Sequence, residues 1–251
     1  MGRTDWATVS KDPEIWKKIA IGGACLTTIL PAPIALGMIN SDLEAEVARR
    51  SGKKSDPPQE YLTGVDDFGK LITSGLGPAM LCAAALLMFA IATIPLGLSY
   101  FQLYAFFRPV NELVPELQAK VAVPITSVLL YFVIGGLGLA AQAVIAACFP
   151  IALAQYARGL DLVPALSPIN NAMLVVEMGM GFWSRALGTA AGMLLMTIIF
   201  ITGGFGLNWF FSTLLCFAVC CWAFVSLALS SRYALEHITA ELPANQPSSE
   251  V

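Results

Sequence analysis

Five long stretches of this 251-residue sequence contain no Asp, Glu, Lys or Arg, and they constrain the fold more than any other feature. A helix that crosses the ~30 Å hydrocarbon core of a bilayer needs about 20 apolar residues. Backbone groups in lipid must bond within their own segment, and the alternation typical of barrel strands is missing. The uncharged stretches are residues 19–41, 71–107, 121–156, 186–205 and 207–231.

These stretches predict an all-α fold, a polytopic transmembrane bundle of about five membrane-spanning helices with short amphipathic interfacial helices. The predicted membrane domain covers residues 16–238, between a polar N-terminal segment at 1–15 and a disordered tail at 239–251. We place the five spans near residues 19–41, 75–103, 123–156, 184–203 and 207–231. The charged residues are then expected outside the membrane cores, in the N-terminal segment, the connections and the tail.

The composition supports the same class of protein. Apolar residues make up 57% of the chain, charged residues 12%, and the mean hydropathy is +0.73. An average soluble domain is about 25% charged, so too little polar surface is present for a globule in water. The formal charge of −3 offers no basic face for phosphates. Composition therefore excludes a soluble enzyme, a disordered chain and a nucleic-acid binder.

Prolines and glycines leave two spans open to alternatives. Pro31 and Pro33 can interrupt the first apolar stretch and turn it into a re-entrant hairpin. The third stretch can be one helix or a hairpin broken at Gly135 and Gly136. Six basic residues fall on the N-terminal side of a five-span bundle and eight on the other. The positive-inside rule therefore only slightly favours a cytoplasmic loop from Asp42 to Lys70.

Two amphipathic stretches precede membrane helices. Thr63 and Asp66 have capping-box spacing, and an apolar face follows at Val65, Phe68, Leu71 and Ile72. Ser167 suits an N-cap and Pro168 the first helical position of the second stretch, whose apolar side contains Ile169, Met173, Leu174 and Val176. Helices of this kind lie in the membrane interface, where they shape loops, gate a cavity or dock a partner.

An internal repeat is suggested by one tetrapeptide. The sequence Pro-Ile-Ala-Leu begins at Pro33 and again at Pro150, each time late in an apolar stretch. A polar stretch, an amphipathic stretch and another membrane helix follow both copies. Repeats of helical units are common in transporters, whereas these four residue types are abundant enough here to recur by chance.

The usual signatures of catalysis and metal binding are missing. The sequence contains no G-x-S-x-G, H-E-x-x-H or P-loop motif, and His237 is the single histidine. All six cysteines fall inside predicted membrane helices, where small packing side chains are the better interpretation. We therefore expect no enzyme activity, no catalytic residues, and no cofactor or metal site. The cysteines are Cys25, Cys82, Cys148, Cys216, Cys220 and Cys221.

Three polar residues are the candidates for a cavity or gate. Glu177 is flanked by apolar residues on both sides, so it faces either a cavity or headgroup water. Gln142 and Thr28 lie within predicted spans, where uncharged polar side chains line a path or hold helices together. A polar cavity lined by all three would favour transport, and a dry bundle would favour a scaffold.

The order of several residues resembles the prokaryotic multi-pass family catalogued as domain of unknown function 4013, over roughly residues 15 to 238. The resemblance rests on Gly37, Arg49-Arg50, Gly52, Pro57-Pro58, Asp66-Asp67-Phe68-Gly69-Lys70-Leu71 and Gly75-Leu76, then on Pro150, Tyr156-Ala157-Arg158, Trp183 and Arg232-Tyr233. Met38 replaces the family's usual aromatic residue, and Pro57-Pro58 lies further upstream than its Leu-Pro. The resemblance implies a multi-pass protein of the prokaryotic cytoplasmic membrane, without an assigned reaction.

Two functions are consistent with these observations. The first is a non-enzymatic scaffold or accessory component of a membrane assembly, in which the partners are the lipid bilayer and either another membrane protein or further copies of the chain. The second is a small-molecule transporter or permease subunit, which the repeat and the glycine-rich helices favour. No nucleic-acid partner is expected.

Overall fold

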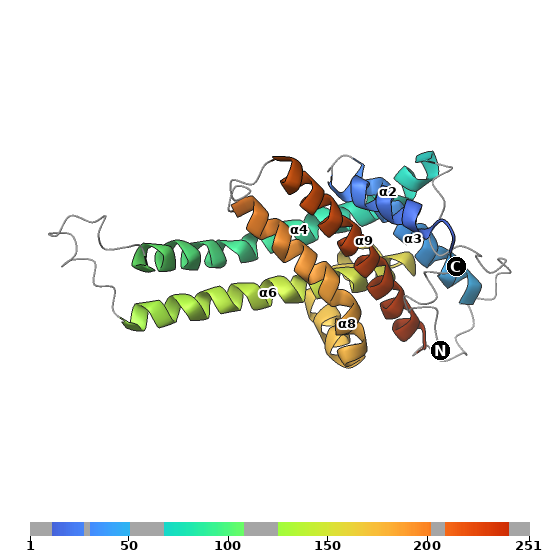
Figure 1. Ribbon diagram of the computed structural model, residues 1–251. Coiled ribbons are helices and arrows are strands. Elements are labelled where there is room, and N and C mark those ends of the chain that lie inside the picture. Colours follow the sequence, from blue (N-terminus) through green and yellow to red (C-terminus); the bar gives the residue numbers. More distant parts are fainter. Residues whose placement is uncertain (1–11, 28–30, 51–67, 108–124, 202–208, 241–251) are drawn as a thin grey trace. The chain divides into compact units, whose positions relative to one another are not determined.

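The computed structural model describes residues 12–27, 31–50, 68–107, 125–201 and 209–240 (Figure 1). These residues form seven helices and no strand, which confirms the all-α prediction. The helices are α2 (Ile15–Thr27), α3 (Ala32–Arg50), α4 (Phe68–Phe107), α6 (Ile125–Ala157), α7 (Leu162–Ala165), α8 (Pro168–Ile201) and α9 (Trp209–Ala240).

Three of the described helices are long and apolar enough to cross a membrane, which supports a membrane protein. The candidate spans are Phe68–Ser99 in α4, Leu129–Ala157 in α6 and Thr213–Thr239 in α9. They overlap the second, third and fifth predicted spans. Because α6 continues through Gly135 and Gly136, the alternative of a hairpin broken there is wrong. The prediction of five spans is not confirmed.

The first predicted span, residues 19–41, is not one helix. α2 ends at Thr27 and α3 begins at Ala32, and residues 28–30 between them lie outside the described part of the chain. Proline has no N–H group to donate and fits best in the first turn of a helix, where α3 places Pro33. The Ile34 N–H donates to the Pro31 carbonyl at 2.9 Å. The interruption agrees with the alternative that these prolines suggested.

α3 also continues past the predicted end of the span, through Asp42 and Glu46 to Arg50. The polar connection expected after residue 41 therefore begins as about two and a half further turns of helix. These turns carry charged side chains at helical spacing. Helical geometry places residues three and four apart on the same face, which proves decisive for the candidate site.

α4 and α8 each join residues of an expected amphipathic stretch to the span predicted to follow it. α4 begins at Phe68 and runs without interruption into the second span, whereas Thr63 and Asp66 lie outside the described residues. α8 begins at Pro168, as predicted. It contains a kink at Gly179, whose φ of 60° and ψ of −152° are non-helical. The kink separates the amphipathic first segment, 168–178, from the segment that contains the fourth predicted span.

The chain divides into two compact units. Unit 1 contains residues 1–84 and 146–251, and unit 2 contains residues 85–145. In unit 1, α9 packs against α8, α2 and α3, and α2 also packs against α3. Figure 1 shows α9 (red) running between α8 (orange) and α2 (blue). The described part of unit 2 is formed by α4 from Ala85 onward and α6 up to Ile145.

The contact between α3 and α4 in unit 1 depends on two glycines. A Cβ atom at Gly75 would lie 1.8 Å from the Pro33 carbonyl oxygen, and one at Gly37 would lie 2.0 Å from the Leu71 carbonyl oxygen. Distances this short leave no room for any side chain at either position. Asn40 adds a polar contact, because its Nδ2 donates to Oγ of Ser74 at 3.1 Å. Small residues of this kind let membrane helices approach closely.

The two copies of the Pro-Ile-Ala-Leu sequence occupy different positions in their helices. Pro33 lies in the first turn of α3, whereas Pro150 lies inside α6, close to its C-terminal end. Both copies contribute buried side chains to unit 1, including Leu36 and Leu153. The internal repeat stays a prediction.

Candidate functional site

A network of buried charged side chains joins α3 to α9 in unit 1. Asp42 and Glu46 are four residues apart and therefore lie on one face of α3. Nη1 of Arg232 on α9 lies 3.2 Å from Oδ2 of Asp42, and its Nη2 lies 3.4 Å from Oε2 of Glu46. The Arg232 and Glu46 side chains are each 2% exposed and that of Asp42 is 8% exposed. One guanidinium group therefore spans two buried carboxylates on the neighbouring helix.

Glu46 is the most heavily paired member of this network. Besides Arg232, it accepts hydrogen bonds from Nε of Arg49 at 2.9 Å and from Nε of Arg50 at 2.8 Å. Arg50 extends the network to α9, where its Nη1 donates to Oγ1 of Thr239 at 2.6 Å and its Nη2 lies 3.7 Å from Oε1 of Glu236. Three arginines thus converge on one carboxylate.

A second buried ion pair lies beside the network, at the start of α2. Nζ of Lys18 donates to Oδ2 of Asp12 at 2.9 Å, and both side chains are almost fully buried. Lys18 is also close enough to act electrostatically on Asp42. Lys18 lies about as far before the break between α2 and α3 as Asp42 lies after it. Because these two residues are close in space, the two helices form an antiparallel hairpin.

The two carboxylates on α3, which lies outside the candidate spans, have opposite titration behaviour. Burial raises the pKa of Asp42 to about 7; Arg232 and Lys18 oppose this effect, and the negative charge of Glu46 adds to it. Burial also acts to raise the pKa of Glu46, but hydrogen bonds from Arg49 and Arg50 and the charge of Arg232 outweigh it and lower that pKa to about 2. Glu46 is therefore a permanent anion, and Asp42 is a buried group that exchanges a proton near neutral pH.

This network corrects the expectation that the charged residues lie away from the membrane helices. Arg232 lies inside the candidate span Thr213–Thr239, and its partners are buried on a helix predicted to end at residue 41. Two sequence signals could have indicated it: the four-residue spacing of Asp42 and Glu46, and the Arg49-Arg50 pair three and four residues further along. The long-range partner on α9 carries no local signal.

The three residues predicted to line a cavity or gate do not share one environment. Gln142 is buried in unit 2, where its Nε2 donates to Oγ1 of Thr93 at 2.7 Å. Glu177 is exposed in unit 1, two residues before the Gly179 kink of α8. Thr28 lies outside the described residues. Gln142 therefore joins two helices, and Glu177 faces outward beside the apolar side chains of Met173 and Val176.

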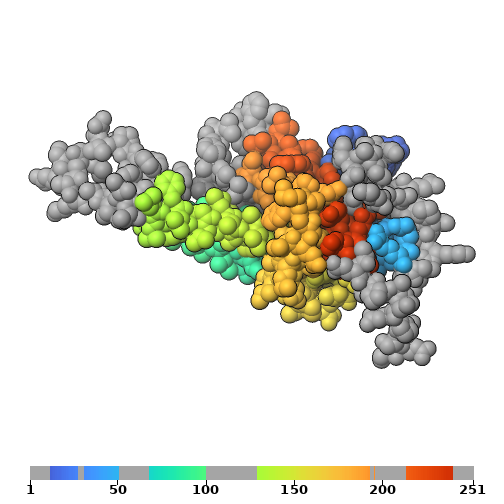
Figure 2. All heavy atoms as spheres, turned by 90° about the horizontal axis from the view of Figure 1, so that it is seen from below, coloured from blue at the N-terminus to red at the C-terminus, as the bar shows by residue number. Residues whose placement is uncertain are grey.

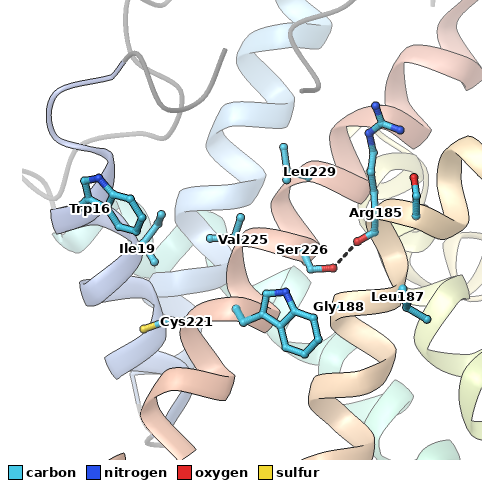
Figure 3. A pocket seen from close by; sticks show the side chains of 11 residues that line it. Trp16, Ile19, Arg185, Leu187, Gly188, Cys221, Val225, Ser226 and Leu229 are labelled. Carbon is cyan, nitrogen blue, oxygen red and sulfur yellow. Dashed lines mark hydrogen bonds between the residues drawn. The ribbon is translucent and has the colours of Figure 1, made fainter. Parts of the chain in front are cut away.

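Three hollows in unit 1 have defined linings. The first is a groove of about 620 Å³ bordered by α2, α8 and α9 (Figure 3), and its lining includes Trp16, Arg185 and Trp222. The second is a shallow depression along the first segment of α8, beside Glu177. The third is polar and lies between Glu44 on α3 and the turn from Gly159 to Leu162. None of the three is lined by Asp42, Glu46 or Arg232.

The described residues offer little else for catalysis or metal binding. All six cysteines are free thiols, and no group of three or more His, Cys, Asp or Glu side chains with metal-binding geometry occurs among the residues that the structure describes. What the charge network can do is hold the α2–α3 hairpin on α9 and bind a proton at Asp42.

Comparisons with known proteins give no relative for this chain, since no family model, curated protein or solved structure matches it. The resemblance to domain of unknown function 4013 therefore stays a prediction.

Proposed function

We propose that this protein is a non-enzymatic integral membrane protein that acts as a scaffold or accessory component of a membrane assembly, in the prokaryotic cytoplasmic membrane. The observation that carries the proposal is the pairing of the buried charges with one another. Arg232, Asp42 and Glu46 bond across α3 and α9 and line none of the three hollows. Buried charges used in this way fix how helices assemble, rather than contacting a substrate.

The first segment of α8 supplies a surface for a partner in this proposal. Ile169, Met173 and Val176 recur every three or four residues and are all strongly exposed, whereas Val175 and Met178 on the opposite side are buried. Figure 2 shows α8 at the surface on the face in view. An exposed apolar stripe of this length is typical of a helix that contacts lipid or another membrane protein.

Site-specific photo-cross-linking tests the proposal. A photoreactive phenylalanine analogue in place of Val176, 79% exposed, should give a discrete protein adduct in native membranes. The adduct is either a dimer of this chain or a complex with a second protein. The buried neighbour Val175 is the matched control and should give none. Leu137 on α6, which is 66% exposed, is the reference position for the adducts that a side chain in contact with lipid forms. Adducts only to lipid at Val176, as at Leu137, would contradict the proposal.

The second candidate function is a small-molecule transporter or permease subunit, with five crossings arranged as two related units. Asp42 favours it, because a buried carboxylate that exchanges a proton near pH 7 is a common element of proton-coupled transport. Reconstitution into liposomes with an internal pH-sensitive dye tests it. Proton flux that a substrate induces in the wild-type protein and that Asp42→Asn abolishes would support transport over the scaffold.

A further inference from the structure

The exposed face of the first segment of α8 is apolar at its centre and polar along one edge. Ile169, Met173 and Val176 form the centre. Asn170 and Glu177 are seven residues apart, so they lie on the same edge of this face, and both are exposed. A shallow depression follows the face, and Glu177 is the one charged residue among the described residues that line it. The face therefore combines an apolar stripe with a single anionic side chain at its border.

Glu177 carries a charge that the described part of the chain leaves without an ion-pair partner. Residues 168–178 contain no Lys or Arg. The segment ends at the Gly179 kink, and the C-terminal end of a helix carries a partial negative charge at which a cation is favourable and an acid is not. The carboxylate and the helix end therefore both attract a positive charge from outside the segment.

This composition distinguishes between the possible occupants of the face. Two copies of the chain that met here about a two-fold axis would bring identical surfaces together. Each copy would contribute Glu177 but no cation from residues 168–178, so the pairing would leave both carboxylates without a counter-ion. Lipid hydrocarbon would cover the apolar centre but supplies no charge. A helix with an apolar stripe and a basic side chain beside it complements both the centre and the edge.

We propose that the first segment of α8 binds an apolar helix of a second membrane protein, and that a Lys or Arg side chain of that helix pairs with Glu177. This inference rests on the scaffold function and names its partner as a protein different from this chain. Ile169, Met173 and Val176 have the i, i+4 and i+7 spacing of the anchors by which one helix packs on another. The ion pair fixes the register of the two helices and excludes a partner of like charge.

Charge variants of Glu177 test the inference by photo-cross-linking of the full-length protein in native membranes. Each protein carries the photoreactive phenylalanine analogue at Val176. Glu177→Gln should lower the yield of the adduct with the second protein by about two- to fivefold, the range for one exposed ion pair. Glu177→Lys should lower it by about tenfold or more, since like charges then meet. Glu177→Asp should retain the adduct. Glu14→Gln, which neutralises an exposed carboxylate outside α8, is the matched control and should leave the yield unchanged.

Salt provides a second measurement that needs no substitution at a folded site. The adduct yield of the wild-type protein should fall as the salt concentration rises from about 0.05 M to about 0.5 M, whereas that of Glu177→Gln should not. Mass spectrometry of the cross-linked peptide should place a Lys or Arg within one helical turn of the modified residue.

Separate outcomes contradict this inference and the scaffold function. A homodimer adduct at Val176, a yield that Glu177→Lys leaves unchanged, or a cross-linked helix without Lys or Arg would overturn the inference. The scaffold function would stand in these cases, because a protein adduct at Val176 still forms. The absence of any protein adduct from the wild-type protein would overturn both.

Discussion

Arg232 on α9 lies 3.2 Å from Asp42 on α3, although the two residues are 190 positions apart in the sequence. The same guanidinium group reaches Glu46, so one side chain ties the C-terminal part of α9 to the α2–α3 hairpin. A buried ion pair does not by itself add much stability, because desolvation offsets the attraction between the charges. Removing one partner is different, since it leaves the others buried without compensation.

Glu46→Gln should therefore be strongly destabilising. The substitution leaves Arg49, Arg50 and Arg232 facing one another without the anion that they share, and we expect a loss of about 3–5 kcal/mol in the free energy of unfolding. Denaturation in detergent, followed by tryptophan fluorescence, measures it. Glu14→Gln is the matched control, because Glu14 is exposed and lies 4.0 Å from an equally exposed Lys17. A loss no larger than that of the control would show that the network does not form.

Asp42 should make stability fall as the pH rises from about 4 to about 7. The pKa of Asp42 is raised from 3.8 to about 7 in the folded protein, so the folded state binds more protons than the unfolded state in this window. Stability then decreases with pH, by at most about 1.4 kcal/mol per pH unit for one proton. Above pH 7 the full destabilisation is present, and below pH 4 it is absent.

Asp42→Asn tests this origin of the pH dependence. The variant keeps a neutral side chain at every pH. The free energy of unfolding of the variant minus that of the wild-type protein should therefore increase as the pH rises from 5 to 8. Glu46 does not interfere in that range, because its pKa is lowered to about 2 from 4.5 and its contribution is lost only as the pH falls through those values. Unfolding curves at several pH values are the measurement. Parallel pH profiles for the two proteins would assign the titration to another group.

How far the sequence predicts this fold depends on whether a feature is local. Long apolar stretches predicted α6 at residues 123–156 and a helix at 75–103 within α4, because a membrane helix is specified by its own composition. The helix expected near residues 19–41 does not stop at Ser41, since α3 continues to Arg50 and buries charged side chains against α9. That burial depends on Arg232, a residue distant in sequence, and no local pattern specifies such a pairing.

The glycines at the contact between α3 and α4 should not tolerate alanine. A Cβ atom at Gly75 would lie 1.8 Å from the Pro33 carbonyl oxygen, so Gly75→Ala requires the helix backbones to move apart. We expect a loss of about 1–3 kcal/mol, as for overpacking in a core. Gly136→Ala is the control, because no atom lies within 4 Å of a Cβ there. Alanine in a helix interior should stabilise that site by up to about 1 kcal/mol. Opposite signs in a thermal unfolding assay would confirm the contact, and equal effects would exclude it.

Gly179 should be the residue that sets the direction of the amphipathic segment of α8. Its φ of 60° with ψ of −152° is a conformation that only glycine adopts readily, and nothing lies within 4 Å of a Cβ there, so the backbone alone resists substitution. Gly179→Ala should therefore either cost about 1–3 kcal/mol or straighten the kink. Spin labels at the exposed positions Met173 and Leu187, one on each side of the kink, distinguish these results by the distance between them. Unchanged stability together with an unchanged distance would mean that the kink does not depend on glycine.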